Sequence, residues 1–315
     1  MLKTMSIRKI TLTTIALFAC FLIYLVPANK LEINEELEYV DSNVNYKPVF
    51  LLDKNGYVAQ TKINVKEEKI EDKARELLNV LTIGSSENKI PNGFSPIIPP
   101  NTEILDLSYE NGLIKVNFSK DILEISEELE EKMIEAIVYS LTSIDEVKNV
   151  IIYVDSKILS KLPKTKINLP STLNRSFGIN KEFNLTSTKD ITDVTVYYIN
   201  QINDNYYYVP VTKYVNDTRD KITIVIDELT TGFNYNNNLM SFLNEDVKLV
   251  SSSNKDNTLN LEFNSSIFDN ENTKEILEEV IYTICLSAYD NYDVDDVVLI
   301  VNNEKIYESG KKTIE

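Results

Sequence analysis

The clearest alternation of apolar and polar positions lies between residues 98 and 157. Apolar residues alternate with polar ones over Glu103–Tyr109 and again over Leu113–Phe118. This two-residue period predicts two strands, each with one buried face; Leu105, Leu107 and Tyr109 would share the buried face of the first. Asn111-Gly112 stands between the runs and supplies the two positive-φ positions of a tight turn, so we expect an antiparallel hairpin.

The pattern then changes to a helical period. An apolar stripe predicts a helix that begins after Ser126 as N-cap, with Glu127 and Glu128 suiting the positive end of the helix dipole. The stripe consists of Leu129, Met133, Ile134, Ile137, Val138 and Leu141. The run Val150–Val154 is wholly apolar, which is typical of a strand buried on both faces.

Turn and packing motifs in this stretch resemble those of the GerMN domain found in spore-germination and sporulation proteins. They are Pro100-Asn101-Thr102, the Asn111-Gly112 turn, the strand Val116–Ser119 and the strand that starts at Val147 and ends at Asp155. The resemblance covers roughly residues 48–158 and implies an α+β fold similar to ring-building-motif proteins. Motifs of this kind are specific for fold and carry little information on chemistry.

The second half of the chain repeats the first at an offset near 147 residues. Adding 147 takes Val49 to Val196 and the helical stripe onto Ile276, Val280, Ile281, Ile284, Cys285 and Ala288. Before the hairpin turn, an offset of 142 takes Leu105 and Leu107 to Val247 and Leu249; after the turn the offset is 145. The difference predicts that the hairpin turn of the second half is three residues longer than that of the first. So long a period indicates a duplicated domain and not a solenoid.

We therefore predict an α+β fold with two tandem copies of a small sheet packed against two helices, behind an N-terminal membrane anchor. The second copy lacks the Pro-Asn-Thr segment and the Asn-Gly turn and is divergent. The expected organisation is an anchor over residues 1–30, a stalk over 31–47, a first GerMN-like domain over 48–158, a connector over 159–193, a second domain over 194–308 and a tail over 309–315. Within the connector, Asn174–Asn180 is expected to pack against one of the domains.

The N-terminus has the features of a signal sequence or signal anchor. Three basic residues precede an uncharged run over residues 10–26, and no acidic residue occurs before Glu32. Basic residues on this side keep the N-terminus in the cytoplasm and place the rest of the chain outside. Leu17-Phe18-Ala19-Cys20 resembles a lipobox, so a lipoprotein acylated at Cys20 stays an alternative to the uncleaved anchor that the length of the run favours.

Charge and composition exclude several classes of function. The net charge is −17, and residues 1–30 hold four of the 32 basic and none of the 49 acidic residues, which leaves −21 on the rest of the chain. Such a chain repels nucleic acid. The absence of histidine removes Ser-His-Asp and Cys-His catalysis and disfavours zinc. We predict no catalytic residue, metal site or cofactor, and interpret Cys285 as a small buried hydrophobe.

Two acidic runs and one tyrosine cluster are the remaining candidates for chemistry. The acidic runs are Glu127, Glu128, Glu130 and Glu131, and Asp290, Asp293, Asp295 and Asp296; the tyrosines are Tyr197, Tyr198, Tyr206, Tyr207 and Tyr208. Charge runs are usually solvated faces, and a glycosidase would need a desolvated carboxyl. We interpret the tyrosines as strand residues on a half-exposed sheet, with a sugar- or partner-binding face as the alternative.

The resemblance implies a membrane-tethered, extracytoplasmic, non-enzymatic assembly module in sporulation, spore germination or envelope organisation. Its expected partners are extracytoplasmic envelope or sporulation proteins, further copies of the chain, and the membrane through residues 10–26. The partner surface is expected on the first domain, within residues 85–125. Two alternatives stay open, a domain that binds cell-wall glycan such as peptidoglycan and a carboxylate-dependent hydrolase.

Overall fold

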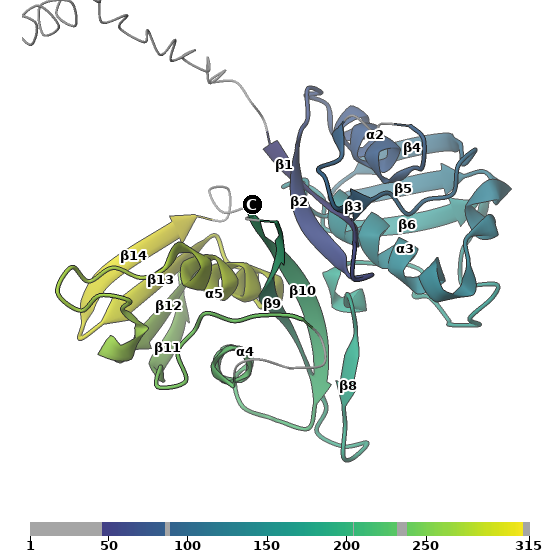
Figure 1. Cartoon of the computed structure of the whole chain (residues 1–315). Coiled ribbons are helices and arrows are strands. Elements are labelled where there is room, and N and C mark those ends of the chain that lie inside the picture. The colour runs from purple at the N-terminus through teal and green to yellow at the C-terminus, as the bar shows by residue number, and fades with distance from the viewer. Residues whose placement is uncertain (1–45, 86–88, 204, 232–237, 311–315) are drawn as a thin grey trace, which may run out of the picture. The chain divides into compact units, whose positions relative to one another are not determined.

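Each half of the chain forms a two-stranded ribbon, two α-helices and a four-stranded sheet (Figure 1). The computed structural model describes residues 46–85, 89–203, 205–231 and 238–310. The first repeat comprises β1 (Tyr46–Asp53), β2 (Val58–Asn64), α2 (Ile70–Leu81), β4 (Ile104–Glu110), β5 (Leu113–Phe118), α3 (Glu127–Leu141), β6 (Asn149–Val154) and β7 (Lys157–Ile158). The second comprises β9 (Thr192–Ile202), β10 (Asn205–Val215), α4 (Lys221–Thr230), β11 (Leu249–Lys255), β12 (Thr258–Phe263), α5 (Glu278–Asn291), β13 (Asp296–Val301) and β14 (Glu304–Gly310).

Short elements complete the two repeats. They are β3 (Phe94–Ser95), β8 (Glu182–Asn184) and the 3₁₀ turns η2 (Lys120–Glu124), η3 (Arg175–Phe177) and η4 (Ser265–Ile267). The α+β class and the tandem copies are confirmed. The prediction of a single sheet in each copy is wrong, because the ribbon and the four-stranded sheet are separate.

The second sheet is needed because the second half of the central helix of each repeat is buried on every side. All residues of α3 from Met133 to Leu141 are buried, and α5 is buried without a break from Thr283 to Tyr289. A helix of this kind must be covered all round. The ribbon β1–β2 and the four-stranded sheet both contact α3, so the predicted stripe is only part of its buried surface.

A buried serine on each central helix completes the hydrogen bonding of the ribbon. Ser140 Oγ accepts a hydrogen bond from the backbone N–H of Phe50 at 2.9 Å. In the second repeat, Ser287 Oγ accepts one from the N–H of Tyr197 at 2.8 Å. Both pairs are related by 147 residues, so the duplication preserves a polar contact as well as the apolar pattern. The contact satisfies a ribbon edge that a purely apolar helix would leave unpaired.

The four-stranded sheets have the same topology in both repeats. Their strand orders are β4-β5-β6-β7 and β11-β12-β13-β14, and only the middle pair of each runs parallel. The strand β6 alternates between buried and half-buried residues. The prediction that Val150–Val154 is buried on both faces is therefore wrong. Helix α3 contacts β6, and Ile151 and Tyr153 lie on the opposite face from the buried Val150, Ile152 and Val154.

The hairpin of the second repeat keeps the same turn length as the first. Asp256 and Asn257 have φ values of 52° and 58°, which correspond to 48° and 82° at Asn111 and Gly112. The strand register gives an offset of 145 throughout, with Ser252 opposite Leu261 where Leu107 lies opposite Val116. The longer turn predicted from sequence is wrong. The polar Ser252, and not Leu249, occupies the position equivalent to Leu107, so matching apolar residues alone gave the wrong offset.

A β-bulge in each first hairpin strand turns one apolar residue outward. The register shifts between Ile104 and Asp106 and again between Leu249 and Ser251. As a result, Leu105 is 48% exposed and Val250 is 62% exposed. Leu105 therefore does not share the buried face of Leu107, contrary to the simple alternation.

The connector packs onto the first repeat. Leu162, Leu169, Leu173 and Ile179 all belong to the buried core of that repeat. The segment from Lys161 to Asn168 closes on itself through a β-bridge, and Leu173 bridges to Val150. The core of the second repeat is a separate cluster that includes Ala59 of β2, so the ribbon of the first repeat contributes to both cores.

Candidate functional site

The two repeats are joined by a sheet that continues from one ribbon into the other. Strands β2 and β10 pair antiparallel at Gln60 and Tyr208, which produces the order β3-β1-β2-β10-β8 with β9 paired to β10. Two residues further along this register, Val58 lies opposite Pro210. Proline has no backbone N–H and cannot donate to the ladder at this position.

The side chain of Asn180 takes the place of the missing backbone pair. Its Nδ2 donates to the carbonyl oxygens of Val58 and Pro210, both at 2.8 Å. Its Oδ1 accepts from the N–H of Val58 at 3.0 Å. Asn180 has a φ of 45°, a left-handed conformation that asparagine tolerates better than most residues. The connector thus supplies the hydrogen bonds that hold β2 and β10 together.

A buried carboxylate holds Asn180 in position. The N–H of Asn180 donates to Glu135 Oε2 at 2.9 Å, and Lys181 Nζ lies 3.4 Å from Glu135 Oε1. Lys181 also pairs with Glu131 at 2.6 Å and lies 3.5 Å from the centre of the Phe177 ring. Burial raises the pKa of Glu135 to about 7, because it outweighs the favourable effects of Lys181 and of the Asn180 N–H on the charged form.

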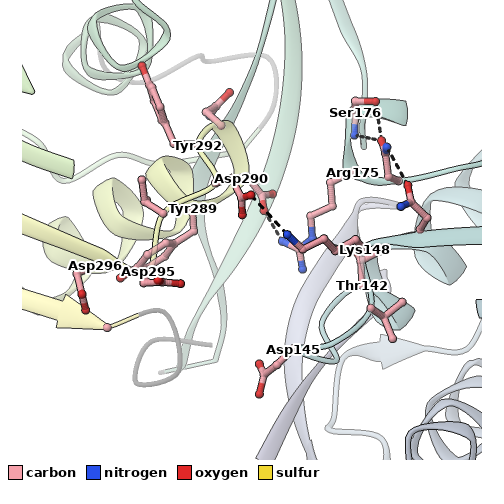
Figure 2. A pocket seen from close by; sticks show the side chains of 17 residues that line it. Thr142, Asp145, Lys148, Arg175, Ser176, Tyr289, Asp290, Tyr292, Asp295 and Asp296 are labelled. Carbon is pink, nitrogen blue, oxygen red and sulfur yellow. Dashed lines mark hydrogen bonds and ion pairs between the residues drawn. The ribbon is translucent and has the colours of Figure 1, made fainter. Parts of the chain in front are cut away.

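Arg175 makes a second polar link between the repeats (Figure 2). Its guanidinium forms an ion pair with Asp290 of α5. It lies 5.0 Å from the ring centre of Tyr139 and 5.7 Å from that of Phe50, within the range of cation–π attraction. Asp290 also accepts a hydrogen bond from the hydroxyl of Tyr197 at 2.9 Å. The positive charge of Arg175 in the connector is thus balanced by the negative charge of Asp290 in the second repeat.

Asp53 forms a third polar link. Its Oδ1 accepts from the N–H groups of Asn55 and Tyr57, both at 2.8 Å. Its Oδ2 accepts from the hydroxyl of Tyr207 at 2.7 Å and from Asn200 Nδ2 at 3.4 Å. Burial and the bond to Asp53 both raise the pKa of Tyr207, so the phenol stays a donor at neutral pH.

Beside this junction lies a polar cleft of about 890 Å³. It is lined by the end of α3 and η3 on one side and by the end of α5 and the start of β13 on the other. Figure 2 shows Asp145 on the side of the first repeat, and Asp295 and Asp296 on the other. No group of three His, Cys, Asp or Glu side chains within the described ranges could hold a metal ion.

The acidic run at the start of α3 is not uniformly solvated. Glu127 and Glu128 are exposed, but Glu130 is only 1% exposed. Glu130 accepts hydrogen bonds from the N–H of Lys164 at 3.0 Å and from the N–H and hydroxyl of Thr165 at 2.7 Å. Burial alone would raise the pKa of Glu130, but these bonds outweigh it and lower the pKa. The solvated-face interpretation is wrong for Glu130, which binds the connector.

The second acidic run also separates into different roles. Asp290 lies in α5 with its side chain 2% exposed in the ion pair with Arg175, so the interpretation as a solvated face is wrong for Asp290. Asp293 has a side chain that is 93% exposed. Asp295 accepts a hydrogen bond from Asn257 Nδ2 at 3.1 Å. The run therefore contains one structural carboxylate and several surface ones.

Most of the tyrosine cluster is buried. Tyr197, Tyr198 and Tyr207 all belong to the core of the second repeat, and Tyr206 is exposed. The interpretation as strand residues is confirmed, but the half-exposed sheet is wrong for β9, because Val194–Asn200 are buried without a break and so lie buried on both faces. Cys285 is buried as predicted, and burial raises the pKa of its thiol to about 12, which makes it a poor nucleophile.

Sequence reasoning did not single out Asn180, Glu135, Arg175 or Asp53 as joining residues. The segment Asn174–Asn180 was expected to pack against one repeat, and it contacts both. The available signal was Pro210 in the middle of an apolar strand, since proline in a strand marks a position without ladder pairing.

A comparison with protein families decides the identity of the fold. A family described as "Germane: Sporulation and spore germination" matches residues 48–160 and 195–307. The chain belongs to the Germane family. The resemblance to GerMN domains inferred from the turn and strand motifs is thereby confirmed.

A protein sequence and a solved structure, both named GerM, are similar to this Germane chain. The chain is 34% identical over 285 residues to the spore germination protein GerM of Bacillus subtilis (strain 168), covering 87% of this chain and 76% of that protein. It is similar to the solved structure of the tandem GerMN domains of the sporulation protein GerM from Bacillus subtilis. That match has a TM-score of 0.75 and 30% identity, and covers 83% of this chain and 92% of the other.

The predicted membrane anchor over residues 10–26 and the lipobox cysteine Cys20 lie outside the described residues. Within the described part of the chain, no helix is long and apolar enough to cross a membrane.

Proposed function

We propose that this Germane protein is a membrane-tethered, extracytoplasmic assembly module in sporulation or spore germination, without enzymatic activity of its own. Its similarity to GerM of Bacillus subtilis supports the process. The basic residues before the apolar run over 10–26 support the tether and the outward orientation.

The proposal rests on the observation that the buried polar side chains at the junction are bonded to other residues of the chain. Glu135 is occupied by Lys181 and Asn180, and Asp290 by Arg175 and Tyr197. A catalytic carboxylate must instead face a substrate across an open cleft. These groups join two repeats into one body, which suits a protein that presents surfaces to partners.

The outward-facing bulges are the candidate contact points for a protein partner. Leu105 lies on the edge strand β4 and inside the expected partner region of residues 85–125, with Glu103, Asp106 and Glu110 beside it. An edge strand can pair with another chain, and flanking charges then select among partners. Val250 is the equivalent residue of the second repeat and provides a matched control.

The test is site-directed photo-cross-linking in membranes of the native cells, with the full-length chain carrying the cross-linker at residue 105 or 250. We expect residue 105 to capture one extracytoplasmic envelope or sporulation protein, identified by mass spectrometry, more strongly than residue 250. In a separate experiment with a lysine-reactive chemical cross-linker on the chain without the photo-cross-linker, Leu105→Asp should abolish capture of this protein and Val250→Asp should not. Tethering provides the high local concentration that such contacts need, so removing residues 1–30 should also reduce capture.

The absence of enzymatic activity is tested separately by incubating the purified chain with peptidoglycan. We expect no soluble fragments to be released. Release of fragments that is lost on Asp145→Asn or Glu135→Gln would overturn the proposal in favour of a carboxylate-dependent hydrolase.

A further inference from the structure

The outer face of the first four-stranded sheet contains a pocket of about 280 Å³, away from the junction. It is lined by Asp106, Ser108, Lys115, Asn117, Tyr153 and Ser156. Asp106 pairs with Asn117, and Asn117 pairs with Tyr153, so these three form one row across β4, β5 and β6. Ser108 and Lys115 are paired in the next row on the same face. Paired residues of adjacent strands share a face, so five strand side chains converge.

One side of the pocket is fixed by the turn between β6 and β7. Asp155 and Ser156 have φ values of 50° and 64°, which bring Ser156 back over β5. The N–H of Ser156 donates to Asn117 Oδ1 at 2.9 Å, and Asn117 Nδ2 donates to Ser156 Oγ at 3.3 Å. The amide is therefore oriented, and because it has two N–H groups the second remains available to a ligand.

Among the described residues, the charged side chains of the pocket have no protein partner. Within the described residues, Asp106 and Lys115 make neither an ion pair nor a side-chain hydrogen bond. Lysines at the junction differ in this respect, since Lys181 and Lys213 both form ion pairs. The unpaired carboxylate of Asp106, the unpaired ammonium group of Lys115, the remaining N–H of the Asn117 amide and the phenol ring of Tyr153 thus converge on one pocket.

This combination matches the chemistry of a sugar ring. Neighbouring hydroxyls of a pyranose each donate and accept, so they can bond a carboxylate and an ammonium group together. The C–H groups on one face of the ring carry partial positive charge and pack against the negative face of a phenol ring. A simple anion or cation would leave one of the two charges unmatched. The volume lies near the lower limit of ligand pockets, about 300 Å³, which fits one ring.

We propose that this pocket binds one pyranose ring of a glycan. The proposal goes beyond the assembly function and does not depend on it. The second repeat provides an internal comparison, because its equivalent positions carry Ser251, Ser253, Asn260, Glu262 and Ile300. The lysine and the tyrosine are absent there, so the glycan site belongs to the first repeat alone.

Saturation-transfer difference NMR on the detergent-solubilised full chain tests the proposal, since this method detects weak binding. The probes are chitotetraose and cellotetraose, which differ in their acetamido groups. We expect transfer to the sugar C–H protons of at least one probe; stronger transfer to chitotetraose would identify an N-acetylated glycan such as that of the cell wall. Tyr153→Ala should weaken binding about tenfold, since loss of an aromatic contact costs about 1.4 kcal/mol.

The variants separate binding from folding. Lys115→Ala changes a surface side chain and should weaken binding without lowering the unfolding temperature, and Tyr153→Phe should retain most of it. The matched controls Asn260→Ala and Ile300→Ala should leave binding unchanged. Absence of transfer to both probes, or equal binding by the wild type and by Lys115→Ala and Tyr153→Ala, would overturn the proposal.

Discussion

Replacing Asn180 by alanine tests the most specific feature of the junction. The substitution removes three side-chain hydrogen bonds and leaves the N–H and carbonyl of Val58 and the carbonyl of Pro210 without their partner. A buried unpaired polar group costs about 1–3 kcal/mol. Alanine at a φ of 45° adds about 1 kcal/mol of backbone strain. Because water can enter and bond some of these groups, we expect a loss near the low end of the sum, about 4–6 kcal/mol in the free energy of unfolding.

Two further variants separate the causes. Asn302 has a φ of 52° and is exposed, so Asn302→Ala should cost only the backbone strain of about 1 kcal/mol. Asn180→Asp keeps the acceptor for Val58 but removes both donors and places a carboxylate near two carbonyl oxygens and Glu135. It should therefore destabilise at least as much as alanine at neutral pH.

The assay is urea denaturation followed by far-ultraviolet circular dichroism, with the free energy obtained by linear extrapolation. Limited proteolysis provides a second measurement, since loosening of β2 from β10 should expose the connector around residues 181–190 to cleavage. Similar free energies for Asn180→Ala and Asn302→Ala would show that the amide does not hold the strands together.

Four other predictions concern stability. The pKa of Glu135 is raised from 4.5 to about 7 in the folded state, so between these pH values the folded state binds more protons than the unfolded state. The free energy of unfolding should therefore fall by roughly 3 kcal/mol as pH rises through that window. Glu135→Gln should remove this fall, and parallel profiles of unfolding free energy against pH for the variant and the wild type from pH 5 to 8 would contradict the prediction. Ile137→Asp should unfold the chain, because Ile137 is fully buried and an unpaired carboxylate there costs several kcal/mol. Glu130→Ala should lower the free energy of unfolding by about 2–4 kcal/mol, because it leaves two N–H groups and a hydroxyl of the connector unpaired. An unfolding temperature within 1 °C of the wild type for Glu130→Ala would show that these hydrogen bonds do not stabilise the fold. Leu105→Asp should change the unfolding free energy by less than about 0.5 kcal/mol, since bulge residue Leu105 is exposed, and a large loss in calorimetry would mean that the side chain is buried.

Local sequence determined most of the secondary structure of this protein. The alternation over Leu113–Phe118, the Asn111-Gly112 turn and the helix after Ser126 all occur as predicted. These features depend on neighbours a few residues away, which a sequence pattern reports directly. The offset near 147 also identified the duplicated domain, because burial of the same faces preserves apolar positions.

Packing between distant segments decided the parts that the pattern did not reveal. Glu130 lies in an acidic run that looks solvated, but Lys164 and Thr165 fold back over it. The bulge that exposes Leu105 depends on strand pairing, and no residue type marks it.

The junction is the clearest case of a feature that only the tertiary structure determined. Asn180 bonds Val58, which is 122 residues away, and Arg175 pairs with Asp290, which is 115 residues away. The pocket with Lys115 and Tyr153 likewise combines three strands. Periodicity describes which face of an element is buried, but the partner of a polar side chain is set by the direction in which separate elements meet. That direction follows from the packing of two central helices between their ribbons and sheets, which no single segment encodes.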